Sequence, residues 1–150
     1  MRLTTYSDYA LRVLMYLALK SDGLSTIAAI AESYDISEAH LMKVVHQLGV
    51  AGYIETVRGR GGGLRLAKPV EAISLAEVIR TTEPDMAVVS CLKPVNASCT
   101  INPSCVLKRA LKRAQDAFME VLEGYTLADL VAPRARLAGL LGIPQGTSPQ

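Results

Sequence analysis

Residues 37–66 read SEAHLMKVVHQLGVAGYIETVRGRGGGLRL, and this stretch decides the fold. Its first half places apolar side chains at the spacing of one helix face, at Leu41, Val44, Val45 and Leu48. We therefore expect a helix over 37–51. The second half predicts a strand over 53–57, a glycine-rich turn over 58–63 and a returning strand over 64–66. An amphipathic helix followed directly by a basic, glycine-rich hairpin indicates a recognition helix and its wing.

The segments upstream complete the motif. Apolar periodicity predicts a helix over 5–19 and a shorter helix that ends near Tyr34, for which Ser25 is the expected N-cap. Asp35 and Ile36 form the turn into the recognition helix. Two short helices joined by a tight turn, the second with a polar outer face, outline a helix-turn-helix. The predicted fold class is therefore mainly α, a winged helix-turn-helix with a two-stranded wing and a long C-terminal helix.

Downstream of the wing, Ser74 and Glu77 have the spacing of a capping box and predict a helix that ends near Thr82. Periodicity then stops until Asn102 and Pro103, which suit the start of a long helix that ends near Gly124. A short helix over 126–131 is expected after it. The predicted division is a DNA-binding domain over 1–82, a cysteine-rich loop over 83–105, a dimerisation helix with a short terminal helix over 106–143, and a frayed tail over 144–150.

The long helix carries an apolar seam whose members are spaced by four and three residues: Leu107, Leu111, Ala114, Phe118, Val121 and Tyr125. This is the spacing of a coiled coil, which needs a partner helix. Since the sequence predicts no second long helix, we expect the partner to be a second copy of the chain, giving a homodimer. Packing of the seam on the N-terminal domain of the same chain is the alternative.

Composition excludes several classes of protein. The chain has 150 residues, 50% of them apolar and 5% aromatic, and a formal net charge of only +2. Such a small charge excludes a generally basic polyanion binder, so DNA contacts must come from a few placed residues. We find no phosphate-binding loop and no catalytic Ser-His-Asp pattern, and we expect no enzyme. Without a signal-peptide pattern or a membrane-length apolar run, a cytoplasmic protein with reduced thiols and no membrane contact is expected.

Five residues are the candidates for DNA contact. Ser37, His40 and Lys43 lie near the start of the recognition helix, where side chains reach base edges or nearby phosphates. Arg58 and Arg60 lie on the wing and can reach phosphates or a narrow minor groove. Because a dimer places two recognition helices in successive major grooves, the expected partner is double-stranded DNA with an inverted-repeat operator.

The cysteines form the second candidate site. Cys91, Cys99 and Cys105 are separated by seven and five residues, gaps too wide for paired zinc knuckles, and no histidine lies nearby. Four basic residues occupy the first turns of the long helix, where cations oppose the helix dipole: Lys108, Arg109, Lys112 and Arg113. They indicate a nearby anion, and three thiolates around an iron–sulfur cluster would supply one. A solvated basic face that needs no anion is the alternative.

Several motifs together resemble the winged-helix iron–sulfur transcriptional regulators of bacteria, over about residues 1–130. They are Asp8-Tyr9-Ala10-Leu11-Arg12, Ile36-Ser37, His40-Leu41, Lys43-Val44, the segment 48–52, Arg58-Gly59, Gly62-Gly63, Leu66-Ala67, and the three cysteines before a long helix. The wide first cysteine gap is most similar to the nitric-oxide-sensing, NsrR-type members. Members of the IscR type carry a histidine ligand where this chain has Lys108.

The resemblance implies a cluster held by Cys91, Cys99 and Cys105, with [4Fe-4S] favoured over [2Fe-2S]. It also implies a fourth ligand from the N-terminal helix of the other subunit, where Asp8 stands. From the residues alone, Asp8 shares a helix stripe with Leu11 and is expected to face packed surface; favouring the helix dipole is its other explanation.

The function implied by the resemblance is a repressor that senses nitric oxide. Nitrosylation of the cluster would lower DNA affinity and release genes for nitric oxide detoxification. The alternatives are a regulator of the same fold that senses cluster supply or redox state, a thiol-only sensor in which two of the three cysteines form a disulfide, and an iron–sulfur electron carrier or enzyme.

Overall fold

The computed structural model describes residues 1–20, 22–93 and 99–145. Its helices and strands are α1 (Thr5–Leu19), α2 (Ile27–Tyr34), α3 (Glu38–Val50), β1 (Ile54–Val57), β2 (Gly63–Leu66), α4 (Leu75–Thr82), α5 (Val106–Glu123), α6 (Leu127–Leu130) and α7 (Arg134–Leu140). Single 3-10 turns are η1 (Val70–Ala72), η2 (Ser90–Leu92) and η3 (Asn102–Ser104). The predicted fold class, mainly α with a two-stranded wing, is confirmed.

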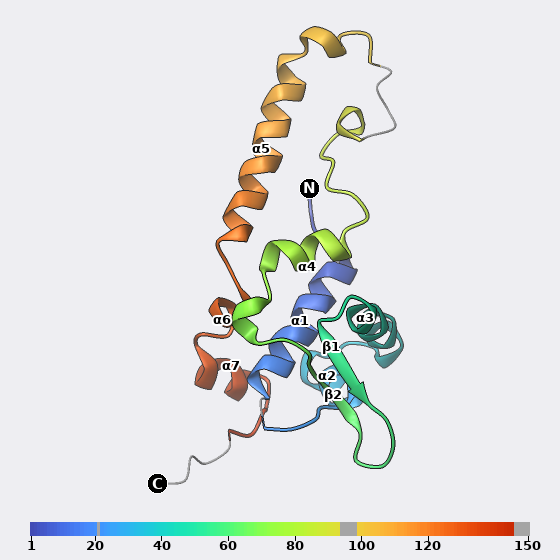
Figure 1. Ribbon diagram of the computed structural model, residues 1–150, viewed down its shortest axis with the longest axis vertical. Coiled ribbons are helices and arrows are strands. Elements are labelled where there is room, and N and C mark those ends of the chain that lie inside the picture. The colour runs from blue at the N-terminus through green and yellow to red at the C-terminus, as the bar shows by residue number, and fades with distance from the viewer. Residues whose placement is uncertain (21, 94–98, 146–150) are drawn as a thin grey trace.

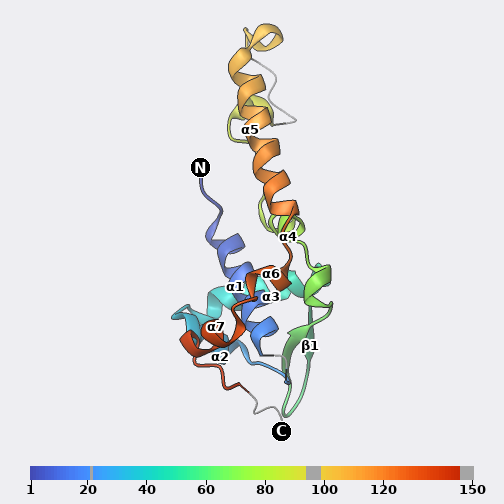
Figure 2. The ribbon, with the colours of Figure 1, turned by 90° about the vertical axis from the view of Figure 1, so that its left-hand side faces the viewer.

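Figure 1 shows a body and an arm. The body holds α1 to α4, the wing, α6 and α7, whereas α5 extends away from it together with residues 83–93 and 99–105. Figure 2, turned by 90°, shows the same separation, so the extension does not depend on the view. We call residues 83–105 the cysteine arm. No helix in the described part of the chain combines the length and hydropathy needed to span a bilayer.

Helix α1 is the centre of the body. Its first turn is capped by Thr4, whose hydroxyl accepts the Ser7 N–H at 3.2 Å. Eight of its side chains are buried: Ser7, Ala10, Val13, Leu14, Tyr16, Leu17, Ala18 and Leu19. The helix packs against α3, α4, β2, α6 and α7. A helix covered on so many sides takes its stability from packing rather than from propensity.

The helix predicted over 37–51 is confirmed as α3, and all four residues of its apolar stripe are buried. The predicted cap of α2 is wrong, because Thr26 caps that helix through the Ala29 N–H. Ser25 instead exchanges two backbone hydrogen bonds with Leu64, at 3.0 and 2.7 Å. The backbone of Ser25 therefore extends the sheet beside β2, where its N–H and C=O groups both find partners.

The wing is an antiparallel pair in which Ile54 lies opposite Leu66 and Val57 opposite Gly63. Its turn requires glycine. Gly61 has a positive φ of 73°, and a Cβ added at Gly62 would lie 2.2 Å from the Val57 carbonyl oxygen. The glycine run therefore builds a defined turn.

Helix α4 begins directly after Ser74, as predicted, but the capping box predicted there is not formed, and the predicted start of the long helix is wrong. Ser74 makes no capping hydrogen bond and instead pairs with Thr126 in a backbone bridge; the capping box lies at Thr126 and Asp129. At the long helix, Asn102 and Pro103 form the separate turn η3, and α5 begins after Cys105.

The C-terminal segment belongs to the packing of the body. Leu127, Val131, Ala138 and Ile143 are all buried in the core that surrounds α1. Helix α7 has no counterpart among the predicted elements. Of the predicted frayed tail, residues 146–150 lie outside the described residues.

Candidate DNA interface and cysteine arm

The polar face of α3 is open to solvent. Ser37, His40 and Lys43 are all exposed; Ser37 is the N-cap residue of α3, and the other two lie on its first two turns. Ser37 accepts the His40 N–H through its backbone carbonyl at 3.1 Å, while its hydroxyl makes no capping hydrogen bond. That hydroxyl is therefore available to a base edge or a phosphate.

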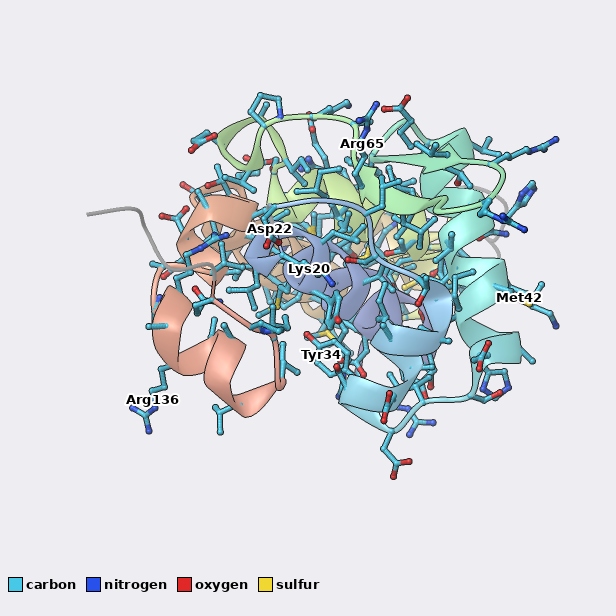
Figure 3. The ribbon with its side chains drawn as sticks, turned by 90° about the horizontal axis from the view of Figure 1, so that it is seen from below. Lys20, Asp22, Tyr34, Met42, Arg65 and Arg136 are labelled. Carbon is cyan, nitrogen blue, oxygen red and sulfur yellow. The ribbon has the colours of Figure 1, made fainter. Side chains whose placement is uncertain are left out.

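Sequence analysis missed Met42, which is 60% exposed between His40 and Lys43. Figure 3 shows its side chain pointing away from the body on α3. An exposed methionine on a recognition helix can contact a thymine methyl group. The available signal was its position off the apolar stripe, since Met42 lies between Leu41 and Val44 without sharing their face.

The start of α1 lies directly against the recognition helix. The Tyr9 and His40 rings have centroids 6.5 Å apart, and a cavity of about 380 Å³ lies beside them. Its lining comes from both helices: Thr5, Tyr6, Tyr9, His40, Lys43 and Val44. The start of α1 is therefore in contact with the helix that carries three of the DNA candidates.

The positive charge of the wing is concentrated at its tip. Arg65 pairs with Glu55 on the facing strand at 2.9 Å, and this hydrogen-bonded pair lowers the pKa of the Glu55 carboxyl. Lys68 lies over the Tyr53 ring. Arg58 and Arg60 are exposed, and among the described residues neither forms an ion pair. They remain available for phosphates.

All three cysteines are free and lie on the cysteine arm or at its end. Cys91 lies in η2, which packs against α5; Cys99 is exposed; Cys105 caps α5. The Cys105 sulfur accepts the Lys108 N–H at 3.3 Å. The structure does not gather the three thiols: within the described ranges, no three His, Cys, Asp or Glu side chains form a metal-binding group.

The donor chemistry of the arm fits a thiolate-bound group. Cysteine sulfurs are the usual protein ligands of iron–sulfur clusters, and the arm carries all three cysteines of the chain, one of them at the N-terminus of α5. Of the four basic residues beside it, two have partners: Lys108 donates to Asn102 at 2.6 Å, and Lys112 pairs with Asp116. Arg109 and Arg113 are exposed.

Asp8 is more exposed than the sequence predicts. Its side chain is 49% exposed and pairs with Arg12 at 3.0 Å, so within one chain it does not face packed surface. Arg12 also lies over the Tyr34 ring, and burial raises the pKa of Tyr34 to about 12. Helix α1 lies in the body, whereas the start of α5 lies at the far tip of the molecule (Figures 1 and 2).

Comparison with known proteins identifies the family to which the chain belongs. A family model described as Rrf2, iron-dependent transcriptional regulator, matches residues 3–133. The chain is 49% identical over 142 residues to the transcriptional regulator NsrR of Bacillus subtilis, covering 94% of this chain and 97% of that protein. It is 48% identical to NsrR of Bacillus licheniformis, covering 94% and 99%.

Two solved structures share the fold. The global cysteine regulator CymR of B. subtilis superposes with a TM-score of 0.71 at 30% identity, covering 88% of this chain and 97% of that one. IscR of T. potens gives a TM-score of 0.71 at 25% identity, covering 97% and 94%. The chain therefore belongs to the Rrf2 family of transcriptional regulators, and it is a DNA-binding regulator rather than an enzyme.

Proposed function

We propose that this chain is a homodimeric repressor that releases its operator when nitric oxide reaches an iron–sulfur cluster on the cysteine arm. The observation that carries the proposal is the arm itself. It bears all three cysteines of the chain, all free, directly before the long helix. The similarity to proteins named NsrR supports the same assignment.

The apolar seam of α5 supports the homodimer. Leu107 and Val121 are 65% and 61% exposed in the single chain, whereas Met119, on another face, is the buried residue of this helix. An apolar stripe of this length on a helix that projects from the body is a surface for association. A second copy offers the same stripe, so a symmetric dimer covers both.

The dimer would bind an inverted repeat. Each copy places α3 in a major groove, with Ser37, His40 and Lys43 toward base edges or adjacent phosphates. Arg58 and Arg60 contact phosphates or the minor groove beside it. The exposure of all five side chains supports these roles.

Cys91, Cys99 and Cys105 would hold the cluster, a [4Fe-4S] form being favoured over [2Fe-2S], and Asp8 of the partner subunit would supply the fourth ligand. When bound, the cluster would supply iron that can react with nitric oxide. Asp8 can serve this role at small cost, because an exposed i,i+4 pair such as Asp8–Arg12 stabilises a helix by only about 0.3–0.5 kcal/mol.

A ligand from across the dimer ties the arm of one chain to α1 of the other. Loss of that ligand would break the tie and leave Asp8 in the pair with Arg12 that it forms within one chain. Helix α1 packs directly on α3, so the two recognition helices lose their fixed separation and the operator is released.

The test uses anaerobically prepared dimer. Iron and acid-labile sulfide are measured per chain, and operator binding is measured before and after stoichiometric nitric oxide. We expect the cluster-loaded protein to bind and the treated protein to dissociate; equal binding in both states contradicts nitric oxide sensing. Absence of iron and sulfide, with a disulfide between two cysteines, would instead indicate a thiol sensor.

Two variants test the fourth ligand. Asp8→Ala should keep the three thiolates but change the absorption and the nitric oxide reactivity of the bound cluster. Asp116→Ala is the matched control, because Asp116 forms the same kind of exposed i,i+4 pair with Lys112 on α5. An Asp8→Ala protein that matches the control in both measurements removes Asp8 from the ligand set.

A further inference from the structure

One carboxylate joins the start of α1 to the start of the cysteine arm. Glu83 follows the last residue of α4 and is the first residue of the arm. It accepts the Thr4 N–H at 2.7 Å, the Thr4 hydroxyl at 3.0 Å and the Ser7 hydroxyl. Thr4 and Ser7 are separated from Glu83 by more than 70 residues in sequence, so these bonds connect two distant parts of the chain.

The hydrogen bonds to this carboxylate continue into a pair of buried hydroxyl groups. Ser7 and Thr82 are both buried, and their hydroxyl oxygens lie 2.8 Å apart. Each hydroxyl has only one hydrogen. The Ser7 hydroxyl donates to Glu83, and the Thr82 hydroxyl donates to the Val78 carbonyl oxygen at 2.9 Å. The hydroxyls of Thr4 and Ser7 therefore both point their hydrogens at the same carboxylate.

The charge of Glu83 strengthens these bonds. Partial burial alone would raise the pKa of its carboxyl group, as does the nearby charge of Asp85, but the hydrogen bonds from Ser7 and Thr4 outweigh both and lower that pKa. Hydrogen bonds to an ionised acceptor are about twice as strong as neutral ones. The negative charge also lies at the N-terminus of α1, where the helix dipole favours it.

We infer that Glu83 is a positioning residue, which fixes the first turn of α1, and with it Asp8, against the root of the cysteine arm. This inference rests on the proposed function, because Asp8 matters only if it serves the partner's cluster. Asp8 follows Ser7 directly in α1, so a bond that holds Ser7 also sets the direction in which Asp8 extends. Each chain thereby fixes the ligand that it offers to the other.

A double-mutant cycle separates positioning from general stability. The rate of cluster loss to an iron chelator is measured in the wild type, Glu83→Gln, Asp8→Ala and the double variant. Glu83→Gln should accelerate loss about tenfold, the factor for one charge-assisted hydrogen bond. In the Asp8→Ala background it should add nothing, because Glu83 acts through Asp8. The same acceleration in both backgrounds overturns the inference. Glu77→Gln, an exposed glutamate on α4, is the control.

A second measurement needs no cluster and so distinguishes this inference from the proposed function. Amide hydrogen exchange of residues 4–8 is followed in the cluster-free protein. Glu83→Gln should accelerate exchange there about tenfold while Glu77→Gln leaves it unchanged. If Glu83→Gln does not fold, Ser7→Ala removes one donor and should accelerate the same amides. Unchanged exchange overturns the inference, whereas wild-type protein without iron or sulfide overturns the proposed function alone.

Discussion

Replacing both wing-tip arginines, Arg58→Gln with Arg60→Gln, should change how operator affinity depends on salt. Both side chains are exposed, and neither has an ion-pair partner among the described residues, so each can neutralise one phosphate. A dimer carries the pair twice. Each lost phosphate contact flattens the slope of log K against log salt by about 0.9, so four contacts change it by about 3.6. Between about 50 and 200 mM salt, the advantage of the wild type over the variant should then shrink about 150-fold.

Fluorescence anisotropy with a labelled operator, titrated at several salt concentrations, measures this slope. The control replaces two exposed arginines outside the wing, Arg113 on α5 and Arg136 on α7, which removes the same charge. Figure 3 shows Arg136 pointing away from the body on the side opposite α3. A slope equal to that of the wild type means that the wing does not contact phosphates. An equal change in the control assigns the effect to net charge.

Three further outcomes are expected. Gly62→Ala should lower operator affinity, because its Cβ would lie 2.2 Å from the Val57 oxygen; Gly139→Ala, with nothing within 4 Å, should spare affinity and raise the unfolding free energy in urea by about 0.5–1 kcal/mol. Val121→Glu places charge on the α5 seam and should give monomers in sedimentation velocity; an unchanged dimer excludes the seam as interface. The lowered pKa of Glu83 stabilises the fold fully above its ordinary value of 4.5, and this stabilisation disappears as the pH falls through the lower native value. Urea unfolding of the wild type and of Glu83→Gln should therefore converge only in acid, and a difference that persists there contradicts the linkage.

Local pattern was sufficient for the recognition helix and the wing. The stripe that includes Leu41 and Leu48 is buried as predicted, because one amphipathic face has only one way to reach the core. The wing turn is also a local matter, since the glycines at 61 and 62 meet steric demands set within the hairpin itself. These elements carry all five DNA candidates.

Helix caps were less predictable than the helices themselves, because several neighbouring residues can cap a helix. Ser25 and Thr26 are chemically equivalent caps, and the choice between them depends on the pairing of Ser25 with Leu64. Ser74 likewise pairs with Thr126 in a backbone bridge. Both pairings join segments far apart in sequence, so no local propensity contains them.

The sequence pattern predicted less of the contacts around the cysteine arm. The cysteine spacing identified the thiols, and the resemblance proposed their role as ligands. Neither predicted that Asp8 is half-exposed and pairs with Arg12, which only the structure shows. The sequence also did not predict the contacts of Glu83 with Thr4 and Ser7. Serine and threonine near a helix start suggest a cap, and nothing in the pattern relates them to a glutamate beyond α4.

Helix α1 is the element through which the two candidate sites can communicate. Its first turn holds Asp8 and is bonded to the arm through Ser7, while its side packs against the recognition helix, with Tyr9 beside His40. Further along, the same helix packs against β2 of the wing. Because a close-packed core moves as a unit rather than deforming continuously, a displacement of α1 shifts α3 and the wing together. Under the proposed function, a change at the exposed carboxylate of Asp8 can therefore reach both elements that carry the DNA candidates.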